Sequence, residues 1–439
     1  MRRNVIVSRQ TTARIMGLLL VSAAIPAFAL ALQEPAFAAP PASAQHASST
    51  GFRQGTEISE PSNAATNPLS ILIGVACTGR GECSAGGSYT DVDGNGQAMA
   101  VTQSRGRWAR AVEIRLPANV AATPYAQING VACTSAGSCV AVGYYRTTAG
   151  YDEGFIVTQK GGTWGRAQQA TPPGNAGAST AGLYGVTCTS AGTCEAVGSY
   201  TDDAMHYQAM VIGEARGHWV HGSELRTPLG APANPGANLT GISCVRAGEC
   251  VAAGYYYTSI SNENDYVAMG AVESHGAWGR ATKLRLPANA APHESSIGSV
   301  SCVASGACLG TGGYATASSF YGLAASESGG HWGRAAEILA KPAHTLSANT
   351  DGVSCATARL CVAAGGYSTA SSNLLAYLVT WSDGRWTKAG GVTLPDNARA
   401  STPRSFFYAV GCVSDGYCAA VGDYLTKTGH YVPMAASRP

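Results

Sequence analysis

Seven pairs of cysteines, each of the form C-x5-C, divide most of this chain into repeats of 53–58 residues. A Val or Ile stands two residues before each first cysteine, and a Gly and a Tyr stand four and six residues after each second cysteine. A period near 55 residues is typical of solenoids, arrays and propellers. The pairs are Cys77/Cys83, Cys133/Cys139, Cys188/Cys194, Cys244/Cys250, Cys302/Cys308, Cys355/Cys361 and Cys412/Cys418.

Within one repeat, the residues indicate four short β-strands. In 128–173, the apolar runs "INGVAC" and "CVAVGYY" flank the turn "TSAGS", and "GFIVTQ" and "TWGRAQQA" follow a polar loop. No segment from residue 51 onward has helical periodicity. Seven such units predict an all-β fold, a seven-bladed β-propeller with four antiparallel strands per blade. A β-helix or β-prism is the alternative.

The last repeat ends after its third strand, and the residues before the first repeat match the missing fourth strand. Phe52 and Ile58 correspond to Trp108 and Ile114 of the next repeat. We therefore expect the N-terminal strand (about 51–61) to complete the last blade, close the ring and make 51–439 one domain. Closure removes the unpaired strand edges that an open propeller would expose.

The repeated aromatic residues have structural interpretations. Six repeats carry a Trp, and the spacing Trp-x-x-small-x-x-aliphatic predicts packing between neighbouring blades. The Tyr that follows each cysteine pair is expected to anchor the second strand through its hydroxyl. The Glu five residues after the Trp, such as Glu113, lies on the predicted outermost strand, where we expect it to face water.

The first 50 residues have the features of an export signal followed by a linker. An apolar run from Ile15 to Leu32 follows basic residues, and Ala36-Phe37-Ala38 is a cleavage site of the A-x-A type. We predict a signal peptide (1–38) and a flexible linker (39–50). A retained membrane anchor is the alternative, but Pro26 interrupts the apolar run. The mature protein is expected to be secreted and extracellular, with no membrane segment.

The cysteine pairs are predicted to be seven structural disulfides. Every cysteine of this exported chain has a partner at the same short spacing. C-x5-C is not a usual zinc spacing, no column of His accompanies it, and redox sites prefer C-x-x-C. We therefore predict disulfides between adjacent strands, and neither a metal nor a cofactor.

Composition and motifs exclude several kinds of chemistry. Only 12% of the residues are charged and the formal net charge is +2, so the chain lacks the basic footprint of a nucleic-acid-binding protein. The G-x-S-x-G, G-x-x-x-x-G-K-[ST] and H-E-x-x-H motifs are absent. The segment "DVDGNG" (91–96) matches half of a calcium loop. Met99 and Thr102 stand where further ligands are needed, which favours a plain turn.

The candidate ligand-binding residues lie around the loops between the second and third strands. A propeller brings these loops to one face, together with the long connections between blades. Their Tyr, Asn, Ser, Asp and Gly content suits a carbohydrate or an adaptable protein surface. The candidates are Tyr144, Tyr151, Tyr207, Tyr257, Tyr266, Tyr321, Tyr431, Asp152, Asp203 and Asn264.

The repeat resembles one found in secreted β-propeller proteins of actinobacteria. Its pattern, G-[VI]-x-C-x5-C-x-A-x-G-x-Y followed by G-x-W-x-x-A-x-x-L-x-L-P, covers about 51–439. By fold and export signal, the chain is also similar to the lectin-type propeller subunits of Streptomyces umbrella toxin particles. That similarity implies binding to a target cell surface or glycopolymer, and docking through a small adaptor protein onto a larger antibacterial complex.

Three functions follow as hypotheses. The first is a carbohydrate-binding module, with weak loop sites combined by avidity. The second is an extracellular polysaccharide hydrolase or lyase that uses loop carboxylates such as Asp152, and buried acids of raised pKa near the axis would favour it. The third is a scaffold that grips a peptide in an apolar axial groove.

Overall fold

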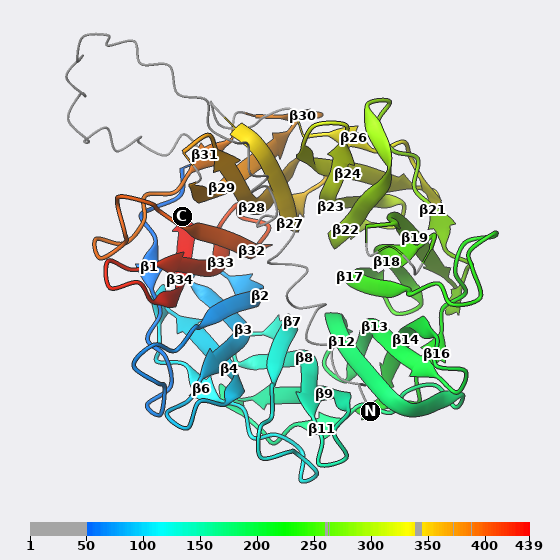
Figure 1. Ribbon diagram of the computed structural model, residues 1–439, viewed down its shortest axis with the longest axis horizontal. Coiled ribbons are helices and arrows are strands. Elements are labelled where there is room, and N and C mark those ends of the chain that lie inside the picture. The colour runs from blue at the N-terminus through cyan, green and yellow to red at the C-terminus, as the bar shows by residue number, and fades with distance from the viewer. Residues whose placement is uncertain (1–50, 260–261, 263, 339–344, 372, 388) are drawn as a thin grey trace, which may run out of the picture. The chain divides into compact units, whose positions relative to one another are not determined.

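Seven small antiparallel sheets are arranged in a ring (Figure 1), and the chain is a seven-bladed β-propeller, as predicted. The computed structural model describes residues 51–259, 262, 264–338, 345–371, 373–387 and 389–439. These residues contain no helix, and therefore none that could span a membrane. The predicted signal peptide (1–38) and linker (39–50) lie outside the described residues.

Each blade has an innermost, a second and a third strand in chain order. The blades are numbered along the chain, so that blade one begins with β2 and blade seven with β32. The innermost strands are β2 (Ile71–Gly79), β7 (Gln127–Ser135), β12 (Ala176–Ser190), β17 (Asn238–Arg246), β22 (Ala290–Ala304), β27 (Thr345–Thr357) and β32 (Ser405–Cys412). The second strands are β3 (Glu82–Thr90), β8 (Ser138–Arg146), β13 (Thr193–Asp202), β18 (Glu249–Tyr257), β23 (Ala307–Thr316), β28 (Leu360–Thr369) and β33 (Cys418–Leu425). The third strands are β4 (Gly96–Ser104), β9 (Asp152–Lys160), β14 (Tyr207–Ala215), β19 (Tyr266–Ser274), β24 (Phe320–Ser328), β29 (Leu374–Ser382) and β34 (Tyr431–Arg438).

The outermost strand is broken into two short pieces in six blades, where the sequence predicts one strand. The cause lies in the neighbouring blade. The Ala111 N–H, between the two pieces of blade one, donates to the Ser59 carbonyl at 2.8 Å and so leaves its own sheet. The same sideways bond recurs from Ala167 to Arg115 at 2.8 Å. The pieces are β5 (Arg107–Trp108) and β6 (Val112–Glu113), β10 (Thr163–Trp164) and β11 (Gln168–Gln169), β15 (His218–Trp219) and β16 (Ser223–Glu224), β20 (Ala277–Trp278) and β21 (Thr282–Lys283), β25 (His331–Trp332) and β26 (Ala336–Glu337), and β30 (Arg385–Trp386) and β31 (Gly390–Gly391).

The N-terminal strand closes the ring, as predicted. Strand β1 (Thr56–Glu57) pairs antiparallel with β34, the third strand of blade seven. Backbone bonds extend the pairing on both sides, from Arg53 to Ser437 and from Ile58 to Pro433, both at 2.9 Å. Phe52 and Ile58 are buried. Blade seven is therefore built from both ends of the described chain.

The hydrophobic core consists of clusters between adjacent blades. Leu72 and Tyr89 of blade one, for example, pack with Val421 and Ala435 of blade seven. Trp164 lies in the cluster between blades one and two, which confirms that the Trp column packs between blades. Phe52 takes the corresponding place between blades six and seven. Stability thus depends on every blade having two neighbours.

A β-bulge in each innermost strand explains the invariant Gly after the cysteine pair. A Cβ on Gly87 would lie 1.9 Å from the Ile71 carbonyl oxygen of the paired strand, and a Cβ on Gly143 would lie 1.8 Å from that of Gln127. Only glycine fits such an approach. The pairing register skips one residue beside these positions. The skipped residues are Ile73, Asn129, Tyr184, Thr240, Gly298, Asp351 and Tyr408.

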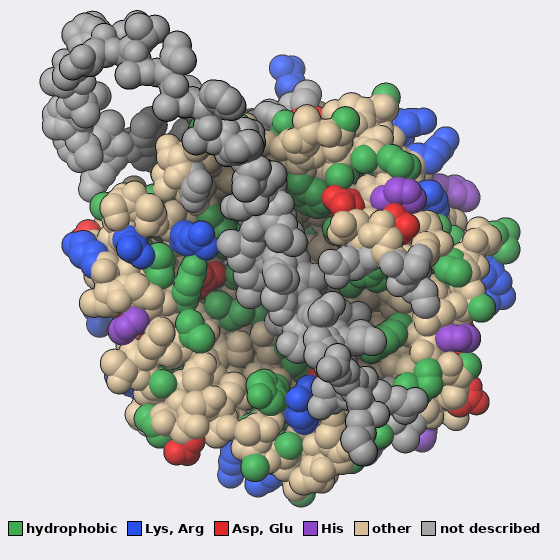
Figure 2. Space-filling model, viewed as in Figure 1, with side chains coloured by type: hydrophobic (Ala, Val, Ile, Leu, Met, Phe, Trp, Pro, Cys, Tyr) green, Lys and Arg blue, Asp and Glu red, His purple; other side chains and the backbone are tan. Residues whose placement is uncertain are grey.

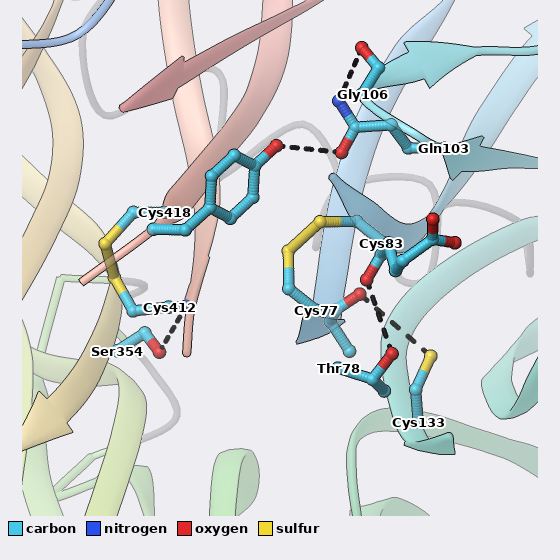
Figure 3. Close-up of a disulfide and its surroundings, with 12 residues drawn as sticks. Cys77, Thr78, Cys83, Gln103, Gly106, Cys133, Ser354, Cys412 and Cys418 are labelled. Atoms are coloured by element: carbon cyan, nitrogen blue, oxygen red, sulfur yellow. Dashed lines mark hydrogen bonds between the residues drawn. A yellow bond between two sulfur atoms is a disulfide. The ribbon is translucent and has the colours of Figure 1, made fainter. Parts of the chain in front are cut away.

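All seven predicted disulfides are present, and each joins an innermost strand to the second strand of the same blade. Figure 3 shows the first and the last of them, which lie in neighbouring blades. The Cys412 N–H donates to the Ser354 hydroxyl of blade six at 2.9 Å, so the disulfide turns are also linked from blade to blade. The bonds are Cys77–Cys83, Cys133–Cys139, Cys188–Cys194, Cys244–Cys250, Cys302–Cys308, Cys355–Cys361 and Cys412–Cys418.

The two cysteines of a pair differ in burial, a difference that the sequence does not predict. The first cysteine of every pair is half-buried at the cysteine turn. The second cysteine is buried in every pair, and in all pairs but Cys355–Cys361 it belongs to one of the clusters between blades. The sulfur atoms of the second cysteines therefore belong to the core and not to a surface that a ligand could reach. These buried residues are Cys83, Cys139, Cys194, Cys250, Cys308, Cys361 and Cys418.

The turns divide between two faces. The cysteine turn and the turn after the third strand share one face, where the Gly106 N–H donates to the Gly81 carbonyl at 3.0 Å. The loops between second and third strands lie at the opposite ends of the strands, beside the blade-to-blade connections, and Ala65 donates to the Thr90 carbonyl there at 2.9 Å. We call this second face the loop face. It carries the candidate residues, as expected.

Candidate functional site

The repeated tyrosine is structural in five blades. In blade one, the Tyr89 hydroxyl lies 2.8 Å from the Asn63 amide oxygen and 2.7 Å from a Glu113 carboxylate oxygen. The Asn63 amide nitrogen donates to the same carboxylate at 2.7 Å. Glu113 is thus exposed, as expected, but also holds the second strand to the incoming connection. The corresponding Tyr–Asn pairs are Tyr145–Asn119, Tyr200–Asn175, Tyr314–Asn289 and Tyr424–Asn397.

Blade four departs from this pattern and carries three clustered tyrosines instead. Gly230 and Lys283 stand where blade one has Asn63 and Glu113. The rings of Tyr255, Tyr257 and Tyr266 lie edge to face, with centroids 5.5–5.9 Å apart. All three side chains are half-buried. We call them the tyrosine cluster.

Two members of the tyrosine cluster, Tyr257 and Tyr266, are candidates from the sequence, whereas Tyr255 is not. The run of three tyrosines at 255–257 in the sequence is the feature that indicates Tyr255 as a further candidate. Side chains alternate along a strand, so Tyr255 and Tyr257 share one side of β18 while Tyr256 points to the other and is buried. Burial also raises the pKa of the Tyr266 phenol.

Hydrogen-bonding groups border the tyrosine cluster. The Asn238 amide donates to the Tyr255 hydroxyl at 3.5 Å, and its buried amide oxygen has no hydrogen-bond partner. Asp265 follows in the loop, with a carboxylate oxygen 3.6 Å from His293 Nδ1 of blade five. Asn264 is exposed in the same loop. This combination of rings, an amide, a carboxylate and an imidazole can bind a polar ligand that also presents a flat apolar face.

A second group of candidates lies in blades two and three. Asp152 is buried and forms an ion pair with Arg146, with Nε–Oδ1 at 2.8 Å and Nη2–Oδ2 at 3.3 Å. Burial, and the nearby charge of Asp152, raise the pKa of Tyr207 of blade three. Tyr144 is half-buried on β8 and Tyr151 is exposed at the loop tip. An acid already neutralised by arginine is poorly suited to proton transfer.

The remaining candidates lie apart from both groups. Asp203 is exposed in the loop of blade three. Tyr321 is half-buried and packs against the core between blades four and five. Tyr431 begins β34 in blade seven. The ten candidates therefore share the loop face but form no single site.

Sequence reasoning missed a polar cluster formed by Asp351, Tyr408 and Asp423, which we call the axial cluster. Asp351 and Tyr408 are bulged residues of the adjacent innermost strands β27 and β32. Asp423, on β33, is 5% exposed. Burial raises the pKa of its carboxyl to about 7. The charges of both aspartates, together with burial, raise the pKa of the Tyr408 phenol.

The calcium-like segment is a turn. Asp91 Oδ1 accepts the N–H groups of Asp93 at 3.0 Å and Asn95 at 2.8 Å, and Oδ2 accepts the Gln97 amide at 2.8 Å. Among the described residues, the one group of three potential metal ligands is Glu195 with Cys244 and Cys250. Those two cysteines are bonded to each other as a disulfide.

Two shallow clefts lie at the seam where the ring closes. The first, of about 320 Å³, is lined by Glu57, Glu60, Asn397, Lys427 and His430 among others. The second, of about 410 Å³, lies beside Asn63 and Glu113. Much of their polar lining already serves the structural Tyr–Asn–Glu networks. On the face seen in Figure 2, charged side chains of both signs are scattered among uncharged ones.

A pair of acids meets on the face opposite the loop face, between blades three and four. Glu195 on β13 forms a side-chain hydrogen bond with Glu273 on β19. Burial raises the pKa of both carboxyls, and the charge of Glu273 raises that of Glu195 further. Two carboxylates in contact cannot both ionise without repulsion, so the pair retains a proton at neutral pH.

Replacing Glu195 with Gln is expected to flatten the dependence of stability on pH. The folded state keeps a proton that the unfolded chain releases near pH 4.3, so stability is highest below that pH and falls as the pH rises towards the raised pKa. The slope amounts to about 1.4 kcal/mol per pH unit for one retained proton. Urea unfolding from pH 5 to pH 8 measures it. Parallel curves for E195Q and the exposed-acid control D203N would contradict this account.

Comparison with known proteins identifies other proteins with this fold but provides no information about the site. The sequence matches no protein-family model, and no curated protein matches it. An ulvan lyase, described as a polysaccharide lyase, is similar in structure over 87% of this chain and 94% of its own, with a TM-score of 0.51 and 8% identity. A Dyadobacter fermentans protein of unknown function (TM-score 0.45, 11% identity) and a Penicillium chrysogenum α-L-arabinanase (0.42, 12%) each match over 88% of this chain and 98% of their own. At such identities the likeness shows the propeller fold alone.

Proposed function

We propose that this protein is an extracellular carbohydrate-binding β-propeller whose principal site is the tyrosine cluster of blade four. The observation that carries the proposal is the group of three half-buried rings bordered by Asn238, Asp265 and His293. Blade six also lacks the Glu, with Gly391 in its place, but among the described residues it packs a pair of tyrosines, Tyr367 and Tyr377, and not three.

The chemistry of this cluster matches that of a sugar. A pyranose ring presents C–H groups on its faces and hydroxyls around its edge, so it needs rigid aromatic surface and planar hydrogen-bonding groups together. Tyrosine supplies such surface at a low cost in side-chain entropy. The Asn238 amide oxygen, buried without a partner, and the Asp265 carboxylate are acceptors for sugar hydroxyls.

The other candidates on the loop face, Tyr151 and Asp203 among them, are proposed to add weaker contacts. Several weak sites on one rigid ring would bind a polymer by avidity. Among the candidate acids, Asp152 is neutralised by Arg146 and Asp203 is exposed, which counts against a catalytic role for either of them. The buried Asp423 carboxyl of the axial cluster, with its pKa raised to about 7, is the observation that favours the hydrolase or lyase hypothesis.

Export and assembly form part of the proposal. Seven disulfides fit an oxidising compartment, in line with the predicted signal peptide. By its resemblance to lectin-type toxin subunits, the propeller would bind a cell-surface glycopolymer and dock through a small adaptor onto a larger particle. Affinity purification from the culture medium of the producing organism tests this, and recovery of the propeller alone would count against the particle.

Glycan-array binding by the mature protein and its Tyr266→Ala variant tests the principal site. We expect a glycan that binds the wild-type protein to bind this variant at least about tenfold more weakly, a loss of about 1.4 kcal/mol. Tyr266→Phe keeps the ring and should keep most of the affinity. Tyr125→Ala, which removes an exposed tyrosine outside the candidate residues, is the matched control. Equal losses for Y266A and Y125A, with unchanged melting temperatures, would overturn the assignment.

A further inference from the structure

The axial cluster contains a buried carboxyl group that the fold satisfies only in part. Asp423 is 5% exposed, and its Oδ1 atom has no hydrogen-bond partner. Burying an ionisable group without satisfying it is costly, so such a group calls for an explanation. Tyr408 from β32 faces the Asp423 carboxyl, and Asp351 from β27 and Tyr431 from β34 in turn act on Tyr408; none of these groups is a cation.

Comparison of the seven blades shows that the fold does not require an acid at this position. Asp423 lies five residues after the second cysteine of its repeat. The other repeats have small or aromatic residues there, and they form the same pair of strands. These residues are Ser88, Tyr144, Ser199, Tyr255, Gly313 and Gly366. The acid is therefore particular to blade seven.

The surroundings of Asp423 specify the kind of ligand. Its carboxyl is hydrogen-bonded with Tyr408, and the Asp351 charge also acts on that phenol, so two carboxyl groups act on one tyrosine. Asp351 Oδ1 also accepts the Asn349 amide at 2.6 Å. The Phe406 and Tyr408 rings, 4.7 Å apart between centroids, add aromatic surface. Asp351 and Tyr408 are half-buried at bulge positions and so remain partly open to a ligand. Acceptor oxygens beside aromatic faces suit a cationic nitrogen.

We propose that Asp351, Tyr408 and Asp423 bind the ammonium group of a sugar that carries a free primary amine. An ammonium can donate to the unpartnered Asp423 Oδ1 and to the Tyr408 hydroxyl oxygen, and the Asp351 carboxylate adds negative charge beside it. Calcium would need six to eight oxygen ligands, which this cluster does not supply. Hydrolysis by a pair of carboxylates would need the sugar between them, whereas here both carboxyl groups act on one tyrosine hydroxyl. That the amine belongs to a sugar rests on the proposed function.

Calorimetric titration with two glucosamine hexamers, one fully deacetylated and one fully N-acetylated, tests the inference. We expect the deacetylated hexamer to bind at least tenfold more tightly to the wild-type protein. Asp423→Asn should remove that preference, and Asp351→Asn should reduce it. Asp93→Asn, which removes an exposed acid that is not a candidate from the same face, is the control for overall charge. Melting temperatures establish that each variant is folded.

A pH series adds a readout that a structural role would not change. The Asp423 proton must leave before the ammonium binds, so affinity for the deacetylated hexamer should fall about tenfold from pH 6 to pH 5. The D423N variant should show no such fall. Equal binding of the two hexamers, no binding of either, or cleavage of either would overturn the inference. Tyr266→Ala separates the two proposals, because failure of the tyrosine cluster alone would leave the amine preference intact.

Discussion

Deletion of residues 51–61 is expected to abolish cooperative folding of the propeller. The deletion removes β1, leaves β34 with an unpaired edge, and takes Phe52 and Ile58 out of the cores on either side of blade seven. Truncating either side chain to alanine alone should cost about 2–5 kcal/mol. Losing both together with the strand pairing approaches the whole stability of a typical domain, about 5–15 kcal/mol.

Thermal unfolding followed by circular dichroism measures this effect, with size-exclusion chromatography to detect association through the exposed edge. Deletion of residues 39–50 is the matched control and should leave the melting temperature unchanged. A folded, monomeric protein with a wild-type melting temperature after loss of 51–61 would show that closure contributes little to stability.

Reduction of the seven disulfides is expected to cause the second large loss of stability. Each bridge closes a loop of only a few residues, which corresponds to about 2 kcal/mol of unfolded-state entropy. Seven independent bridges would sum to roughly 15 kcal/mol as an upper limit. We therefore expect the reduced and alkylated protein to be unfolded at temperatures where the oxidised protein is fully folded.

Urea unfolding with and without reductant measures the total, and the double variant Cys77→Ser with Cys83→Ser measures one bridge. That variant should lose about 2 kcal/mol, and a corresponding variant at Cys355 and Cys361 should lose a similar amount. A reduced protein as stable as the oxidised one would indicate that packing between blades determines stability without the disulfides.

Much of the fold could be predicted from the sequence because the same local geometry recurs seven times. The recurring glycine, such as Gly87, is required because a Cβ at that position would collide with the paired strand in every blade. The cysteine pairs indicate adjacent strands, and Phe52, at the position where other repeats have a Trp, indicates ring closure. Each signal is local, so a single sequence contains it.

The rest depended on contacts, between blades and within one hairpin, that the repeated pattern does not encode. The outer strand breaks because Ala111 donates to Ser59 of the preceding blade. The side chain of Asp152 is occupied by Arg146 across a hairpin, which changes its expected role. The axial cluster escaped notice because the bulged position varies from repeat to repeat. Only positions that are the same in every repeat stand out in the sequence, whereas a residue that binds a ligand in one blade differs from its counterparts in the others.

Ring closure also sets a timetable for the newly made chain. Glu57 and its partner Tyr424 are 367 residues apart. At a synthesis rate of 5–20 residues per second, Glu57 waits roughly 20–70 s before Tyr424 is made. During that interval the early blades can form and stack, while the seam between blades seven and one stays open. The ring therefore closes only after β34 has been synthesised, and until then the nascent chain lacks the strand pairing between β1 and β34.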